Sequence, residues 1–439
     1  MLAPCRPLSA SCGASARAMT GGMEDRMRMF TRRGLMAASA TLPVLSALPA
    51  RPRAQGAAPT LRIGVLADFS GPYRDTSGPT SVVCARQAVA DLGLDARGIK
   101  VEILQADHQN KADVGLGIAR RWFDQDGVDA ITEVNNSAVA LAVANLAQEK
   151  DKVVLASGPA SAVLTGERCT SNLVHWTYDT WMCANVVGKA SVRAGNDSFF
   201  FLTADYSFGH QLERDTTAAV QGAGGKVLGS VRFPFPGTAD FSSFLVQAQS
   251  SRAKVVAMAT AGADTVNCMK QAQEFGLTRR QKMLALIAFI CDIHAMGLPA
   301  AQGLLLNETF YWDLNDRTRA FLGRVRDKTP TNWPNQEHAG TYSAVLHYLK
   351  AVADMGPDAA RASGRAVVER MKAMPTDDDC FGPGTLRADG RKIHPAHLFE
   401  VKRPEESQGP WDYYKLVGTV PAAEAFRPMG EGNCPLVRS

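Results

Sequence analysis

Short apolar runs alternate with segments of helical periodicity along two successive stretches of the chain. In the first stretch, residues 61–67 form a β-rich apolar run, and residues 81–92 carry apolar side chains at helical spacing. The pattern starts again with four consecutive apolar residues at 199–202 and a helical segment at 210–221. Repeated strand-then-helix units favour a parallel sheet with helices on both faces. The sequence therefore predicts an α/β fold with two similar halves.

The other expected elements continue this order and then change character. Further strands are expected at residues 100–105, 129–133, 153–156, 226–231, 254–259 and 283–290, and further helices at 113–123, 137–148, 241–249 and 265–275. A helical stretch follows, with segments at 317–328, 340–355 and 365–374. The C-terminal part is rich in loops, with a hairpin turn at 385–391 and a strand at 397–401.

The first 54 residues have the features of an export signal. Arg32 and Arg33 precede a mild apolar run at 35–48 and small residues before Gln55, so we expect export to the periplasm and cleavage after Ala54. The arginine pair suits the twin-arginine (Tat) route, although a Sec signal also carries basic residues there. A run of about 14 residues is too short to span a bilayer, so an uncleaved anchor is the weaker alternative.

Removal of that segment changes the charge balance of the chain. It holds eight arginines and two acidic residues, so the 48 basic and 43 acidic residues of the whole chain become 40 and 41. The apparent basicity therefore belongs to the signal, and nothing in the mature chain indicates a nucleic-acid surface. We likewise expect no membrane insertion of the mature chain.

The spacing of the cysteines and the absence of common catalytic motifs exclude several classes of site. No Cys-x-x-Cys occurs, which argues against zinc and thioredoxin-like sites. Cys169 and Cys434 lie in loop-like surroundings and form the favoured disulfide pair, with free buried thiols as the alternative. There is no Gly-x-Ser-x-Gly, phosphate-binding loop or His-Glu-x-x-His, so we expect neither an enzyme nor a cofactor nor a metal site.

Small and hydroxylated residues follow two of the expected strands. Asn135, Asn136 and Ser137 lead directly into a helix, and residues 157–161 (Ser157, Gly158, Pro159, Ala160, Ser161) occupy the corresponding place after the next strand. Ligands of open parallel sheets bind at the carboxyl ends of the strands, where free N–H groups at helix starts favour an anion. Ordinary helix capping by Asn and Ser is the alternative for each segment.

Five segments together give the chain a resemblance to a known family. They are residues 63–73, 153–161, 204–209, 240–245 and 339–342. In this order they resemble the branched-chain amino-acid type of periplasmic solute-binding protein of ABC importers, also called the receptor family ligand-binding type. The resemblance covers nearly the whole mature chain.

This resemblance implies a two-lobed type I periplasmic-binding-protein fold, in which each lobe is a parallel sheet between helices and three segments cross between the lobes. We expect the crossings near Asp179, Trp312 and Gly384. The first lobe would then comprise residues 55–178 plus 312–383, and the second residues 179–311 plus 384–439. The implied partners are a small-molecule ligand in the cleft and the membrane permease of the transporter.

The resemblance also implies the residues of the site. The ligand's carboxylate would be held by residues 135–137 and 157–161 of the first lobe. Other positions that match the family's cleft are Tyr73, Asp205, Tyr206, Phe208 and Tyr342.

The chain departs from amino-acid binders at the place where they offer a carboxylate to the ligand's ammonium. Here Phe289 and Ile290 stand at that place, although Asp292 follows closely and Asp264 is another possible counter-ion, with an exposed helix cap as its alternative. An ammonium buried without a partner costs several kcal/mol.

Aromatic side chains near the expected cleft suit a ring, with core packing as the alternative, and Arg74 could pair with a carboxylate. We therefore predict a substrate-binding protein for a small aromatic or apolar carboxylate that lacks an ammonium. The alternatives are a binding protein for a branched-chain or other amino acid or amide, and a ligand-binding component of a sensor.

Overall fold

The computed structural model describes residues 60–329 and 331–437, which belong to one unit, while the predicted export signal lies outside the described residues. The first sheet has five parallel strands in the order β2-β1-β3-β4-β5. These strands are β1 (Thr60–Ala67), β2 (Lys100–Asp107), β3 (Ala130–Glu133), β4 (Val153–Ala156) and β5 (Leu173–His175). Buried apolar side chains point from β1 to both faces of the sheet, so both faces need a cover of helices.

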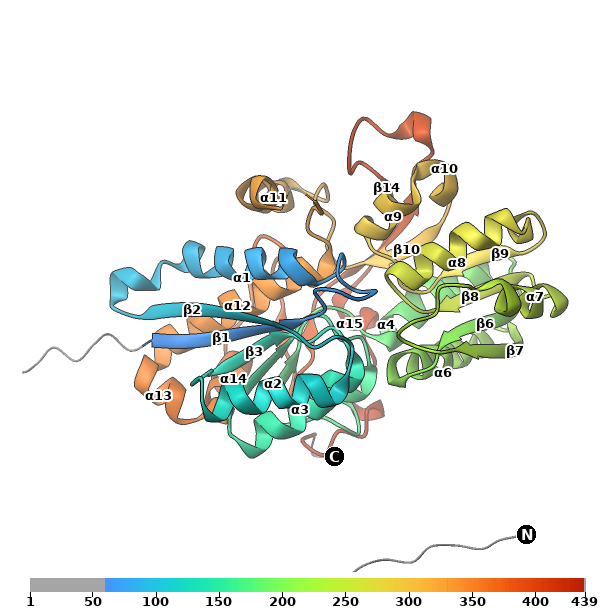
Figure 1. Cartoon of the computed structure of the whole chain (residues 1–439). Coiled ribbons are helices and arrows are strands. Elements are labelled where there is room, and N and C mark those ends of the chain that lie inside the picture. The colour runs from blue at the N-terminus through green and yellow to red at the C-terminus, as the bar shows by residue number, and fades with distance from the viewer. Residues whose placement is uncertain (1–59, 330, 438–439) are drawn as a thin grey trace, which may run out of the picture. The chain divides into compact units, whose positions relative to one another are not determined.

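Two groups of helices cover the first sheet (Figure 1). On one face lie α1 (Gly78–Leu92), α12 (Gln336–Met355) and α14 (Gly364–Ala373), and on the other lie α2 (Ala112–Asp124) and α3 (Ser137–Glu149). The short helices η1 (Leu94–Arg97), η2 (Ala162–Thr165) and α13 (Pro357–Ala362) join these elements. Gly64 lets α2 approach β1, because a Cβ there would lie 2.2 Å from the Trp122 ring.

The second sheet has four parallel strands in the order β7-β6-β8-β9. They are β6 (Ser198–Ala204), β7 (Lys226–Phe233), β8 (Val255–Ala259) and β9 (Lys282–Ala285). Its helices are α6 (Ser207–Gly222), α7 (Ser242–Ser250), α8 (Ala263–Glu274), α9 (Ile290–Met296) and α10 (Leu298–Ala301), with the short η4 (Leu277–Arg279) before β9. The predicted α/β fold with two similar halves is confirmed. The strand expected at 283–290 ends earlier, at Ala285, because α9 begins at Ile290.

Further segments carry the chain between the two sheets. Among these and the later elements, the sequence predicted the helix at 317–328, the turn at 385–391 and the strand at 397–401, but not the others. The elements there are α4 (Thr180–Cys183), η3 (Ala184–Gly188), α5 (Lys189–Arg193), β10 (Leu305–Glu308), α11 (Asp316–Val325) and η5 (Arg326–Lys328). The later elements are β11 (Thr385–Leu386), β12 (Lys392–Ile393), β13 (Ala396–Val401), η6 (Pro404–Glu406), β14 (Tyr414–Val420), α15 (Ala422–Ala425) and η7 (Met429–Glu431). Strands β10, β13 and β14 form an antiparallel sheet, and β11 pairs with β12.

The lobe boundaries remain our proposal, with one change. Residues 384–393 were assigned to the second lobe, but Arg391 bridges to His175 at the edge of the first sheet. The His175 amide also donates to the Gly390 carbonyl oxygen (2.9 Å). We therefore propose the third crossing after Ile393, where β13 joins β10 and β14.

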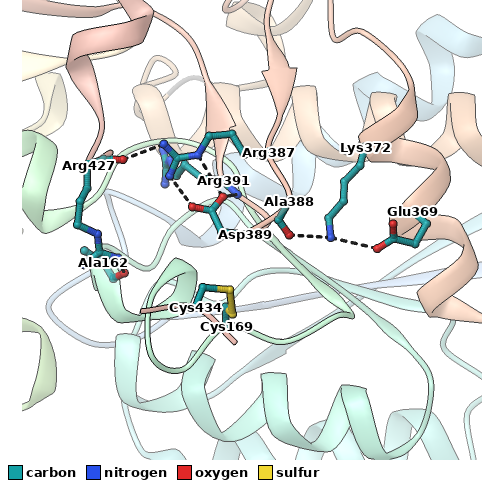
Figure 2. Close-up of a disulfide and its surroundings, with 10 residues drawn as sticks. All are labelled: Ala162, Cys169, Glu369, Lys372, Arg387, Ala388, Asp389, Arg391, Arg427 and Cys434. Atoms are coloured by element: carbon teal, nitrogen blue, oxygen red, sulfur yellow. Dashed lines mark hydrogen bonds and ion pairs between the residues drawn. A yellow bond between two sulfur atoms is a disulfide. The ribbon is translucent and has the colours of Figure 1, made fainter. Parts of the chain in front are cut away.

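A disulfide joins Cys169 to Cys434, the pair that the sequence favoured, with 5.7 Å between their Cα atoms (Figure 2). It links the loop after β4 to the segment that follows α15. Beside it, Arg427 donates to the Ala162 carbonyl oxygen (2.9 Å), and Arg387 donates to the carbonyl oxygen of Arg427 (2.8 Å). In the described part of the chain, no helix is long and apolar enough to cross a membrane.

Candidate functional site

A pocket lies where the carboxyl ends of the two parallel sheets face each other. Nine of its ten lining residues come from the segments that directly follow strands β1, β3, β4, β5, β6, β8 and β9, and the tenth comes from the start of α12. This is the place where open parallel sheets present ligand sites. The lining residues are Tyr73, Thr76, Asn135, Ala160, Tyr178, Tyr206, Phe208, Ala261, Phe289 and Glu337.

Aromatic contacts connect the two sheets at one side of the pocket. The hydroxyl oxygens of Tyr73, after β1, and Tyr206, after β6, lie 2.7 Å apart. Phe235 stacks against both rings, with centroid distances of 5.2 Å and 4.4 Å. Three stacked rings from two lobes bury apolar area only when the lobes are close, so this contact stabilises the arrangement described here.

The backbone makes a second contact between the sheets close by. The Ala263 amide, at the start of α8, donates to the Pro72 carbonyl oxygen (3.0 Å). Gly262 permits this approach, because its φ is +61° and a Cβ there would lie 2.5 Å from the same oxygen. A side chain at this position would hold the two loops apart.

Glu337 gives the pocket a carboxyl group that the sequence analysis missed. Its Oε1 accepts a hydrogen bond from the Tyr178 hydroxyl (2.5 Å), while its Oε2 accepts none from the described residues. The carboxyl also lies within hydrogen-bonding reach of the Glu133 carboxyl. Burial raises the pKa of Glu337 well above its ordinary value, and the nearby Glu133 raises it further. A ligand group that donates a hydrogen bond or carries a positive charge would satisfy this carboxyl.

Glu133 lies behind Glu337, at the end of β3. Its Oε2 accepts hydrogen bonds from the hydroxyls of Ser157 (2.7 Å) and Thr341 (2.6 Å). Burial raises the pKa of Glu133 above its ordinary value, although these hydroxyls oppose that shift. Two buried acids next to each other disfavour a double negative charge, so the pair favours a bound proton or a bound cation.

Asn135 supplies the pocket with a hydrogen-bond donor. Its side-chain oxygen accepts from the Asp68 amide (3.2 Å) and contacts His108 Nε2 (2.8 Å). The Asp68 amide can only donate, so the oxygen of Asn135 must face it and the nitrogen points elsewhere. That nitrogen, Nδ2, is buried and has no partner among the described residues, so it is free for a ligand acceptor.

Six of the residues proposed from the sequence meet in this pocket: Tyr73, Asn135, Ala160, Tyr206, Phe208 and Phe289. Five others surround it without lining it. Asn136 caps α3 by accepting from the amides of Ala138 and Val139, and Ser137 accepts from the Ser161 amide (3.2 Å). Ser157 donates a hydrogen bond to Glu133. Gly158 packs against Asn135, because a Cβ at Gly158 would lie 2.7 Å from the Cβ of Asn135. The capping alternative therefore describes Asn136.

Three proposed residues lie away from the pocket, and we withdraw them from the site. Arg74 is exposed and pairs with Asp75 (3.0 Å). Asp205 is exposed and pairs with His210 (2.7 Å).

The third is Tyr342. It packs against Phe321 in the core of the first lobe and donates to Asp91 (2.8 Å). Its position in the sequence pattern reflects packing of α12 on α1 and α11, so it has no hydrogen-bonding group left for a ligand.

The acids proposed as counter-ions are buried but do not line the pocket. Burial raises the pKa of Asp264, in the first turn of α8, to about 7, so the predicted alternative of an exposed cap does not apply. Asp292 accepts from the Phe289 amide (3.0 Å) at the start of α9, and burial raises its pKa to about 7. Phe289 does line the pocket, and the acid beside the ligand space comes from α12 instead of the second lobe.

Comparison with known proteins agrees with this geometry. A family model described as periplasmic binding protein matches residues 60–409. The chain is 43% identical to a periplasmic binding protein from Burkholderia mallei, with a TM-score of 0.82 over 86% of this chain and 99% of that one.

Two further solved structures are similar to the chain, whereas a search of curated proteins found no match. A branched chain amino acid ABC transporter periplasmic ligand-binding protein from Burkholderia xenovorans is 38% identical, with a TM-score of 0.74 over 86% of this chain and 99% of that one. A solute binding protein from R. palustris in complex with benzoate is 18% identical, with a TM-score of 0.73 over 83% and 97% of the two chains, and it shows likeness of fold alone.

Proposed function

The chain belongs to the periplasmic binding protein family, as its resemblance implied, and from this premise we propose that it captures a small molecule in the pocket between its lobes and delivers it to an ABC importer. The observation that carries the proposal is a pocket formed jointly by the carboxyl ends of two parallel sheets. Two lobes that both contact a ligand can close over it, because the ligand stabilises the closed population. We propose binding and release of an unchanged ligand, without enzymatic turnover.

We propose a small carboxylate with an aromatic or other apolar body as the ligand. Asn135 Nδ2 offers a buried donor without a partner, which suits a carboxylate oxygen. Five of the ten lining residues are aromatic, and their rings would bury an apolar body by stacking and by removal of its surface from water. The carboxylate without an ammonium that the sequence favoured is the first candidate of this class.

An amino acid is the second candidate, and Glu337 favours it. At the expected place in the second lobe, Phe289 and Ile290 offer no acid to an ammonium. Glu337 lines the pocket from the first lobe, and one of its oxygens accepts no hydrogen bond from the described residues. An ionised Glu337 would pair with an ammonium, and such a charged hydrogen bond contributes about 1.5–3 kcal/mol, on the order of ten- to a hundredfold in affinity.

Titration calorimetry with three compounds separates the candidates. 3-Phenylpropionate, L-phenylalanine and 2-phenylethylamine share one aromatic body and differ in their charged groups. Tight binding of 3-phenylpropionate supports the first candidate, and binding of L-phenylalanine at least ten times more tightly supports the second. If neither acid binds, or the amine alone binds, the proposed ligand class is wrong.

A substitution at Glu337 makes the distinction sharper. Glu337→Gln should remove the preference for L-phenylalanine over 3-phenylpropionate if the ammonium contacts this carboxyl. The matched control is Asp205→Asn, an exposed carboxylate outside the pocket, which should leave both affinities unchanged.

We also propose export to the periplasm with cleavage after Ala54. The support is the Arg32–Arg33 pair and the apolar run behind it. Lysines at both positions should abolish periplasmic yield if the twin-arginine route is used. An unchanged yield would point to the Sec route, and an unprocessed N-terminus in the periplasm would contradict cleavage.

A further inference from the structure

Glu308 stands where the chain passes from one lobe to the other. It is the last residue of β10 and is fully buried. Leu306, two residues earlier, belongs to the hydrophobic cluster of the second lobe, and Phe310, two residues later, belongs to that of the first. Its carboxyl group therefore lies between elements that would have to shift relative to each other when the lobes move.

This carboxyl accepts hydrogen bonds from both lobes. Oε1 accepts from the Ile290 amide (3.0 Å) and from the Tyr414 hydroxyl (2.9 Å), and Oε2 accepts from the Gln336 amide (3.2 Å). Ile290 directly follows Phe289 at the start of α9, and Gln336 directly precedes Glu337 at the start of α12. One side chain thus holds the neighbours of two pocket residues that face each other across the cleft.

Neither helix start can satisfy these two amides by itself. At α12, the side chain of Asn335 accepts from the amides of Glu337 and His338, which leaves Gln336 to Glu308. At α9, Asp292 accepts from the Phe289 amide, which leaves Ile290 to Glu308. A buried amide without an acceptor is destabilising, so both helix starts depend on the position of one carboxyl.

We propose that Glu308 is a positioning residue that fixes Phe289 and Glu337 at the distance needed to grip a ligand between the lobes. It touches no ligand itself and acts through the two helix starts. The inference rests on the proposed function only in taking this pocket as the ligand site.

Glu308→Gln tests the proposal with little change in volume. A carboxyl oxygen accepts a hydrogen bond whether or not it carries a proton, whereas an amide nitrogen cannot accept. The variant therefore leaves one of the two helix starts without an acceptor. We expect the affinity for 3-phenylpropionate or L-phenylalanine, whichever binds the native chain, to fall about ten- to a hundredfold.

Tyr414→Phe is the matched control, because it removes a hydrogen bond to Glu308 and leaves both amide contacts in place. Both variants should have a lower unfolding temperature than the native chain. At a temperature where both variants are fully folded, only Glu308→Gln should bind the ligand more weakly. Equal loss of affinity in both variants, or native affinity in Glu308→Gln, would overturn the proposal.

Two further measurements keep the proposal testable. If Glu308→Gln does not fold, Glu308→Asp keeps both acceptor oxygens but draws them back from the two amides by one methylene. This variant should weaken binding two- to tenfold, whereas native affinity would contradict the proposal. If neither compound binds the native chain, the proposed ligand class is wrong. The role of Glu308 is then tested by comparing amide hydrogen exchange in the ligand-free native chain and the ligand-free Glu308→Gln variant. Faster exchange at Ile290 or Gln336 in Glu308→Gln supports the proposal, and unchanged exchange at both refutes it.

Discussion

The hydrogen bond between Tyr73 and Tyr206 should contribute to ligand affinity because it forms between the lobes. Tyr73→Phe and Tyr206→Phe each remove one hydroxyl and keep the ring that stacks on Phe235. In an open molecule the two hydroxyls would be hydrated, so the bond is made on closure. A hydrogen bond between neutral groups contributes about 0.5–1.5 kcal/mol, which corresponds to a two- to thirteenfold change in the dissociation constant.

A double-mutant cycle measures this bond separately from other effects of the two substitutions. Calorimetric affinities of the native chain, both single variants and the double variant should give a coupling energy within that range. Tyr342→Phe is the control, because its hydroxyl bonds to Asp91 within the first lobe and should affect stability but not affinity. Additive effects of the two single substitutions would show that the bond does not form in the ligand-bound molecule.

Three other predictions follow from the packing and the burial of single groups. Gly262→Ala should weaken ligand binding tenfold or more, because its φ is +61° and its Cβ would meet the opposite lobe, whereas Gly276→Ala, at φ +65° with open space around it, should leave affinity unchanged. Burial raises the pKa of Asp264 to about 7 in the folded chain, compared with about 3.9 in the unfolded chain. Between about pH 4 and 7 the carboxyl is therefore protonated in the folded chain and ionised in the unfolded chain. The free energy of unfolding consequently falls as the pH rises through this range. The difference in unfolding midpoint between Asp264→Asn and the native chain should therefore increase in favour of the variant as the pH is raised from about 4 to 7. A difference that does not change with pH would contradict the assignment. Replacing Cys169 and Cys434 by alanine should destabilise the fold by about 2–5 kcal/mol, and a reductant should lower the unfolding midpoint of the native chain but not of the variant.

Local pattern was sufficient for eight of the nine strands of the two parallel sheets and for most of the pocket residues that follow them, but it missed the three-residue strand β5 and Tyr178 behind it. Tyr73 and Asn135 stand in the segments that follow β1 and β3, and parallel strands bring such positions to one edge of a sheet. The pairing of distant segments was not predictable in this way. The resemblance placed the third crossing near Gly384, whereas the bridge from Arg391 to His175 leads us to propose it after Ile393. A hairpin of two-residue strands carries no local signal for the sheet edge that it contacts.

The face of α12 decided which of its residues belong to the site. Glu337 and Thr341 are four residues apart and lie on one face, and both approach Glu133. Tyr342 is five residues from Glu337, about 140° further around the helix, and therefore packs into the core. The sequence alone gave no reason to prefer one face, since apolar and polar residues occur on both.

The Cys169–Cys434 bond has a consequence for a molecule that has been cut by a protease. The two cysteines are 265 residues apart, and the stretch between them contains the whole second sheet, α12 and the passage through β10. A single cut anywhere in that stretch leaves both products covalently attached. The nicked chain would run as one species on a gel without reductant and as two with it. The pocket residues of both lobes would therefore remain in one covalently linked molecule after such a cut, and neither fragment would be released while the disulfide is intact.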